Sequence, residues 1–151
     1  MNKFKKEYDK FLDEFGKGRK MVLSSSENDR ISSRLMSIVQ MNGNFYFQTD
    51  KTFKKYSQIV NNPNCALCID NIQMEGICKE IGHPMSNIDF CNIYQECFNT
   101  SYEKYSSIGN ERLFMFTPTY LERWIYINDI PFLELYEIER KIYKLAEYKT
   151  M

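Results

Sequence analysis

The period of the apolar side chains changes several times along the chain, and each change marks a predicted element. Near the start, large apolar side chains recur at the spacing i, i+4, i+7, i+8 and i+11. They are Phe4, Tyr8, Phe11, Leu12 and Phe15. This spacing puts them on one face and predicts an amphipathic helix over residues 2–16, which ends at the glycines 16 and 18.

Three apolar stretches follow, over residues 21–25, 31–41 and 44–49, and each has the length and composition of a strand. A polar turn at residues 27–30 separates the first two. Asn42-Gly43, a strong two-residue hairpin signal, separates the second from the third. The pattern therefore predicts a three-stranded antiparallel meander after the first helix.

The rest of the chain alternates between helical and strand patterns. A helix capped by Asp50 or Thr52 is expected to run to about Asn61, where Asn61-Asn62-Pro63 stops it. Strands are predicted at 64–70, 72–81, 112–116, 121–127 and 132–137, and helices at 90–98 and 138–149. Gly76, inside a strand, predicts a bulge or the close approach of another group.

Several strands with interspersed helices predict a mainly β fold, a small closed barrel with helical decoration. The 151 residues suit one domain spanning 1–151, and 43% hydrophobic with 15% aromatic residues suit a packed core. Lys+Arg and Asp+Glu are both 20, so the net charge is zero, which argues against a nonspecific nucleic-acid binder. The basic residues are in excess in the first half and the acidic residues in the second.

Membrane and secretory classes are not expected. No apolar run approaches the roughly 18–20 residues that cross a bilayer, and the first residues lack the apolar core of a signal peptide. Five cysteines, an odd number, suit reduced thiols in the cytoplasm. Cys65 and Cys68 have CxxC spacing, but on a strand they point to opposite faces, so neither a metal site nor a dithiol is expected.

One junction has the residues of a phosphate site. Thr49-Asp50-Lys51-Thr52-Phe53-Lys54-Lys55 joins a strand to a helix start, where backbone amides and lysines can bind an anion. Arg34, on the paired strand, can reach the same anion. An ordinary capped helix end with surface lysines is the alternative.

The order of short motifs around this junction resembles the pyridoxamine 5′-phosphate oxidase-like, FMN-binding split-barrel family. The motifs are Arg34-Leu35-Met36-Ser37, then 43–50 (GNFYFQTD), Lys54-Lys55-Tyr56, Ile59 and Asn62-Pro63, followed by 73–76 (QMEG), 112–114 (RLF), Thr117-Pro118 and Trp124. The resemblance covers residues 17–132. It implies a six-stranded Greek-key split barrel, with the helices 2–16 and 138–149 outside this core.

The resemblance also implies a cofactor and roles for single residues. FMN would lie at the interface of a homodimer, with its phosphate held by Arg34, by Thr52 and by Lys54 or Lys55. Leu35, Met36 and Ser37 would line the flavin ring, and Gln48 and Thr49 would lie beside the ring or the ribityl chain. Trp124 would approach the flavin from the partner subunit.

The function implied is that of an oxidoreductase that uses FMN on a small substrate. The flavin supplies the redox chemistry, so no catalytic side chain is identified. The arginine-rich C-terminal signature of pyridoxamine oxidases is absent, which argues against vitamin B6 oxidation. A non-catalytic flavin- or haem-binding protein and an interaction module without cofactor are the alternatives.

Overall fold

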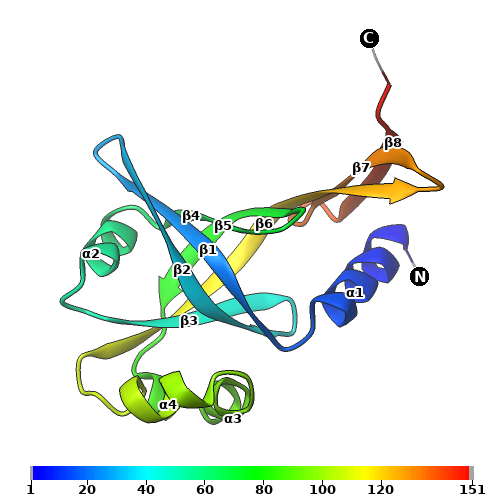
Figure 1. Cartoon of the computed structure of the whole chain (residues 1–151). Coiled ribbons are helices and arrows are strands. Elements are labelled where there is room, and N and C mark those ends of the chain that lie inside the picture. Colours follow the sequence, from blue (N-terminus) through cyan, green and yellow to red (C-terminus); the bar gives the residue numbers. More distant parts are fainter. Residues whose placement is uncertain (1, 150–151) are drawn as a thin grey trace.

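The strands form one antiparallel sheet that closes on itself (Figure 1). In the computed structural model, which describes residues 2–149, the strand order is β3-β2-β1-β4-β5-β6-β7-β8, and β3 also pairs with β6. That last pairing closes β1–β6 into a six-stranded barrel, with β3-β2-β1-β4 in Greek-key order. The predicted split β-barrel fold is confirmed.

The observed bounds of most predicted elements differ from the predicted ones by a few residues. The helices are α1 (Lys3–Phe15), α2 (Lys54–Asn61), the 3-10 turn η1 (Pro84–Ser86), α3 (Ile88–Cys97) and α4 (Asn99–Tyr105). The strands are β1 (Gly18–Glu27), β2 (Arg30–Met41), β3 (Asn44–Asp50), β4 (Asn64–Ile69), β5 (Ile72–Glu80), β6 (Glu111–Ile127), β7 (Ile130–Glu137) and β8 (Ile142–Glu147).

The predicted hairpin at Asn42-Gly43 is present between β2 and β3. Both residues have positive φ, 52° and 85°, as a type I′ turn requires. Asn128 and Asp129 adopt the same region, with φ of 51° and 63°, between β6 and β7. Asn, Asp and Gly tolerate this backbone, and these turns therefore fix the register of the strands beside them.

β6 does not break at Thr117-Pro118, as the sequence pattern suggested. It continues for 17 residues, and Gly76 of β5 lies opposite Pro118 where the register shifts by one residue. This bulge accommodates a proline, which has no N–H to donate to the ladder. The prediction of a bulge or a close approach at Gly76 is confirmed.

The predicted tail helix 138–149 is wrong. Residues 142–147 form β8, which pairs with β7, and Lys141 has a φ of 55° in the turn between them. Ile138, Ile142 and Leu145 have helical spacing, but Tyr143 contacts the buried Tyr136 with ring centroids 4.9 Å apart. A cross-strand aromatic contact of this kind outweighs a weak helical pattern.

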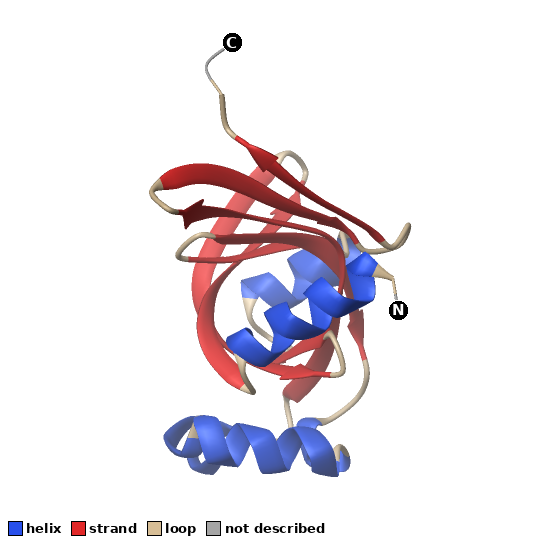
Figure 2. Ribbon diagram, turned by 90° about the vertical axis from the view of Figure 1, so that its right-hand side faces the viewer, coloured by secondary structure: helices blue, strands red, loops and turns tan. Residues whose placement is uncertain are grey.

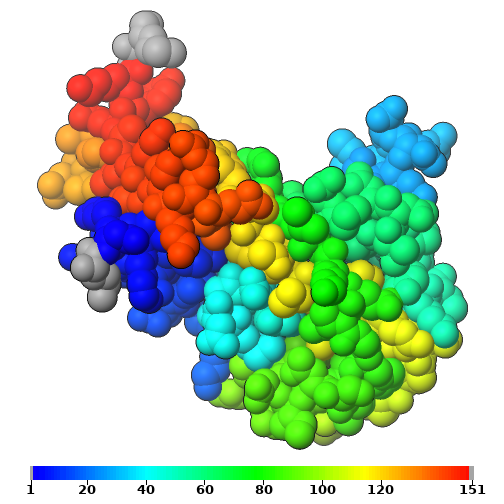
Figure 3. Space-filling view, turned by 180° about the vertical axis from the view of Figure 1, so that it is seen from behind, coloured from blue at the N-terminus to red at the C-terminus, as the bar shows by residue number. Residues whose placement is uncertain are grey.

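α1 covers the region where β7 and β8 extend beyond the barrel. Its Phe4, Tyr8 and Phe11 lie 5.7–6.2 Å from the ring of Tyr136 on β7. Arg123 of β6 connects Glu14 of α1, at 3.1 Å, to the buried Glu134 of β7, at 2.5 Å. Seen from behind, α1 and the β7–β8 hairpin form one side of the molecule and the β1–β2 hairpin projects on the other (Figure 3).

The helical segment after β5 is two helices, α3 and α4, where one helix over 90–98 was predicted. They lie below the barrel in Figure 2 and pack through a second small core that includes Phe90, Tyr94, Val39 and Leu113. This packing positions α3 and α4 beside β2 and β6. Within residues 2–149, no helix has the length and apolar character that a bilayer crossing needs.

Candidate functional site

A cavity of about 450 Å³ lies between the strands β2 and β3, the start of α2 and the α3–α4 segment. Its strand wall is Leu35, Met36, Ser37, Gln48, Thr49 and Asp50. The other walls are Phe53, Lys55, Tyr94, Ser101, Tyr105, Ile108 and Glu111. Its size is within the range of ordinary ligand pockets, about 300–1,000 Å³.

Six of the ten predicted site residues line this cavity together: Leu35, Met36, Ser37, Gln48, Thr49 and Lys55. β2 and β3 pair only between the turn and Val39–Tyr46, so residues 35–37 and 48–49 lie beyond the paired part of the hairpin and line the cavity from two strands, and the residues after β3 turn into α2. Arg34, Thr52, Lys54 and Trp124 do not line it.

The two candidate lysines differ in position. Lys55 lines the cavity and is half-buried, whereas Lys54 is exposed and points elsewhere. Burial and the neighbouring charge of Arg34 both lower the pKa of Lys55. No carboxylate of the described residues lies within ion-pair distance of Lys55. Its charge is thus available to an anionic ligand.

Arg34 is next to the cavity, on the other side of β2 from Leu35. Its guanidinium donates to the carbonyl of Leu23 at 3.2 Å, to Ser25 Oγ at 2.9 Å and to Gln58 Oε1 at 3.2 Å. All three acceptors are neutral, and burial lowers the pKa of Arg34, although an arginine stays charged. Two cations, Arg34 and Lys55, therefore lie close together without a protein counter-ion in contact.

The start of α2 leaves backbone donors free. Its N-cap position is Phe53, no side chain caps it, and the Tyr56 amide donates to the Phe53 carbonyl, so the amides of Lys54 and Lys55 are the available donors. The predicted cap residues bond to each other instead. Asp50 Oδ1 accepts from the amide and the hydroxyl of Thr52, at 2.8 and 2.6 Å, and these bonds lower the pKa of Asp50. The Thr52 hydroxyl is therefore already used, which leaves the amides of α2 as the donors at this end.

A buried polar chain forms another part of the cavity wall, and the sequence reasoning missed it. Ser106 Oγ donates to Gln48 Oε1 at 2.7 Å, and Gln48 Nε2 donates to Glu111 Oε1 at 2.7 Å. Burial raises the pKa of Glu111, and the Gln48 bond opposes this. Glu111 precedes the predicted strand 112–116, and no sequence signal marks it.

His83, in the turn after β5, has both ring nitrogens engaged. Its Nδ1 accepts from the amide of Met85 at 3.1 Å, so its Nε2 carries the proton and donates to the Ile108 carbonyl at 2.8 Å. His83 therefore holds the segment that carries Ile108, a residue of the cavity wall.

The CxxC pair lies on β4 as predicted. Cys65 is buried and Cys68 is exposed, since side chains three apart on a strand point to opposite faces. Trp124 lies near the far end of β6, beside Tyr126, Pro131 and Tyr148. Within one chain it does not reach the cavity.

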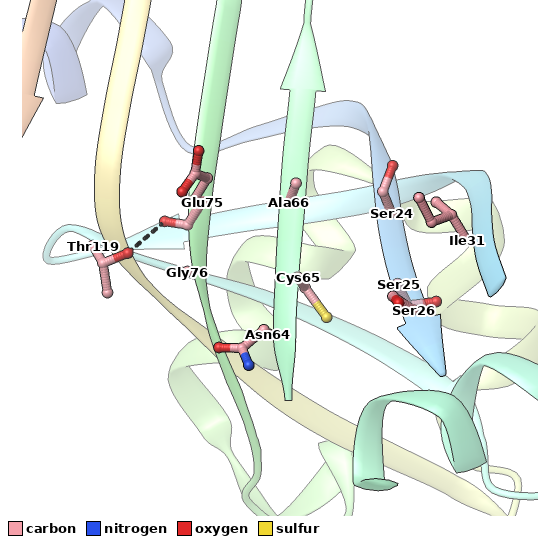
Figure 4. A pocket seen from close by; sticks show the side chains of 10 residues that line it. All are labelled: Ser24, Ser25, Ser26, Ile31, Asn64, Cys65, Ala66, Glu75, Gly76 and Thr119. Carbon is pink, nitrogen blue, oxygen red and sulfur yellow. Dashed lines mark hydrogen bonds between the residues drawn. The ribbon is translucent and has the colours of Figure 1, made fainter. Parts of the chain in front are cut away.

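A second hollow of about 390 Å³ lies on β1, β4 and β5 (Figure 4). Its floor is made of small residues such as Ser24, Ser26 and Ala66, and Thr119 closes it by donating to the Glu75 carbonyl at 3.3 Å. Glu75 is the one charged residue among its ten lining residues. No lysine or arginine is among these residues, whereas Lys55 lines the β2–β3 cavity, so the β2–β3 cavity is the candidate site.

No protein-family model and no curated protein sequence matches this chain. Solved structures do match it. General Stress Protein 26 of Bacillus anthracis is 23% identical with a TM-score of 0.58, over 77% of this chain and 90% of its own.

Two further structures cover similar lengths. A pyridoxamine 5′-phosphate oxidase-related, FMN-binding protein of Nostoc punctiforme has a TM-score of 0.63 at 15% identity, over 87% of each chain. The haem storage protein HutZ of Vibrio cholerae has a TM-score of 0.59 at 13% identity, over 78% of this chain and 91% of its own. The chain therefore has the split β-barrel fold of the pyridoxamine 5′-phosphate oxidase-related, FMN-binding proteins, in agreement with the sequence motifs.

Proposed function

We propose that this chain binds FMN in the β2–β3 cavity and acts as an FMN-dependent oxidoreductase on a small molecule. The observation that carries the proposal is Lys55 in the cavity wall with Arg34 next to it outside the lining, neither of them in contact with a carboxylate of the described residues. A phosphate supplies the missing charge, and the uncapped start of α2 adds backbone donors.

The other predicted residues take roles that follow from their positions. Leu35, Met36 and Ser37 on one strand and Gln48 and Thr49 on the next contact the ring and the ribityl chain. Lys55, and not Lys54, holds the phosphate. When bound, FMN supplies the redox chemistry, and these residues position it and limit the access of water.

The proposal includes a homodimer. Leu35 is 61% exposed and Phe53 55% exposed at the edge of the cavity, and a partner subunit that closes the cavity would cover this apolar surface. Trp124, 44% exposed in one chain, would meet the flavin only as the partner's residue. Five free cysteines suit a cytoplasmic location.

The first test is the absorbance spectrum of the purified protein, followed by titration of the apoprotein with FMN. We expect flavin bands and saturable quenching of FMN fluorescence, and reduction of the bound flavin by NADH or NADPH. A chain that binds no FMN contradicts the proposal. FMN that binds but that no donor reduces supports the non-catalytic alternative.

The haem alternative has a separate readout. His83 is the only histidine of the chain, and both its ring nitrogens are engaged. A histidine-ligated haem would therefore have to break these bonds. We expect the Soret band of added haemin to show no shift or sharpening at concentrations where FMN binds.

Replacing Lys55 by alanine is expected to weaken FMN binding by about tenfold, since a hydrogen bond to a charged group is lost. The matched control is Lys54→Ala, in the same turn but exposed, which is expected to change the affinity by less than about twofold. The two dissociation constants are compared by fluorescence titration. A larger effect for Lys54 would reverse the assignment.

A further inference from the structure

The carboxylate of Glu111 has one oxygen that the protein leaves open. Glu111 is 7% exposed, and its Oε1 accepts from Gln48 Nε2 at 2.7 Å. No described residue donates to Oε2. No side-chain oxygen that is fully shielded from solvent lacks a partner, so Oε2 retains access to solvent. Because Glu111 lines the cavity, that access is through the cavity.

The orientation of this carboxylate is fixed from behind. An ionised carboxylate only accepts, so Gln48 must present its amide nitrogen to Glu111 and its oxygen to Ser106. Both side chains are buried, and the chain of bonds holds Glu111 in one position. A polar group held in this way in a pocket is an element of ligand recognition rather than a mobile surface charge.

The charge of Glu111 is not neutralised by an ion pair. No described cation lies within 4 Å of it, and a carboxylate oxygen in a buried position without a donor is costly. Lys55 and His83 are the nearby positive or titratable groups, and Asp50 adds a like charge. A ligand that brings a hydrogen-bond donor to Oε2 would satisfy this group.

The position of Glu111 in the cavity indicates which group of the ligand donates to Oε2. Glu111 on β6 pairs with Asp50 at the end of β3, and the chain turns from there into α2, which carries Lys55, so Glu111 and Lys55 are at the same end of the cavity. If Lys55 holds the phosphate, the adjoining part of FMN is the ribityl chain. Its hydroxyls are donors, whereas the phosphate oxygens are acceptors and the one N–H of the oxidised ring is at the far end of the cofactor from the phosphate.

We propose that Glu111 Oε2 accepts a hydrogen bond from a ribityl hydroxyl, so that Glu111 selects flavins that carry the polyol chain. This inference rests on the proposed function. Gln48 is then a positioning residue that acts through Glu111.

The test compares two phosphate-free probes, riboflavin and lumiflavin, which has a methyl group in place of the ribityl chain. We expect wild type to bind riboflavin more tightly, and Glu111→Leu to reduce the riboflavin-to-lumiflavin affinity ratio by about tenfold. Glu111→Asp keeps the charge but withdraws the oxygen by one methylene, so it is expected to reduce the ratio too. Glu111→Gln, which keeps the length and an amide oxygen, retains most of it. Glu147→Gln, at an exposed position on β8, is the control and leaves the ratio unchanged.

Each outcome has one meaning. If the riboflavin-to-lumiflavin affinity ratio is the same in wild type and in the Leu and Asp variants, the assignment is overturned. An equal loss of affinity for both probes leads to the same conclusion, because it indicates a contact between Glu111 and the ring. If wild type binds FMN but the ratio never changes, only this inference fails. If wild type binds no flavin at all, the proposed function fails with it. The Asp variant keeps the test decisive if the Leu variant does not fold, which circular dichroism reports.

Discussion

Gly76→Ala is expected to destabilise the folded chain by about 3 kcal/mol, at the upper end of the usual cost of overpacking. A β-carbon at this position would lie 2.5 Å from Cζ of Phe116 and 2.5 Å from the carbonyl oxygen of Thr117. The oxygen belongs to the backbone of β6 and cannot rotate away. Phe116 is fully buried and packs edge-on against Phe45 at 6.4 Å, so its ring has no free space to enter.

The measurement is the thermal midpoint of Gly76→Ala against Gly109→Ala. No atom lies within 4 Å of a β-carbon at Gly109, and its φ is outside the left-handed region. The Gly76 variant is expected to lose roughly 6–12 °C for a chain of this length, and the control to change little. Equal midpoints would mean that β5 and β6 separate easily at the bulge.

The same site shows why the sequence predicted some elements and missed others. The signals for the hairpin at Asn42-Gly43 and for the close approach at Gly76 are local, because each depends on the backbone freedom of one or two residues. The continuity of β6 through Pro118 is not local. It depends on Gly76, more than 40 positions earlier in the chain, whose bulge accommodates the proline.

The tail and the cavity follow the same distinction. Residues 142–147 become a strand because β7 has an unpaired edge and because Tyr136 provides a buried aromatic contact. The helical spacing of the tail contains no information on either feature. Leu35, Gln48 and Lys55 could be placed at one site from the order of motifs in adjoining elements. Glu111 could not, since its importance comes from Gln48 and Ser106, which reach it only in the folded chain.

Arg34→Ala is expected to weaken FMN binding by about 1.5–3 kcal/mol, or roughly ten- to a hundredfold. The guanidinium has only neutral acceptors, Leu23, Ser25 and Gln58, so its charge is directed at no protein anion. Its neighbour Lys55 is also without a counter-ion in contact, and a phosphate relieves the repulsion between the two. An arginine fork can give two parallel bonds to phosphate, which is why its loss is expected to exceed that of Lys55.

The measurement compares the dissociation constants of FMN and riboflavin. Riboflavin lacks the phosphate, so its dissociation constant is expected to change little. The fold is expected to tolerate the change, since the hydrogen bond of 2.9 Å from Ser25 Oγ to Gln58 Oε1 does not involve the arginine.

Arg19→Ala is the matched control on the adjacent strand, because Arg19 bonds only the carbonyls of Phe15 and Glu14 and does not line the cavity. Arg34→Lys keeps the charge without the two parallel N–H groups, so its FMN dissociation constant is expected to lie between those of wild type and Arg34→Ala. An equal loss of FMN and riboflavin would make Arg34 a residue of the barrel's packing alone, because only a phosphate contact separates the two ligands.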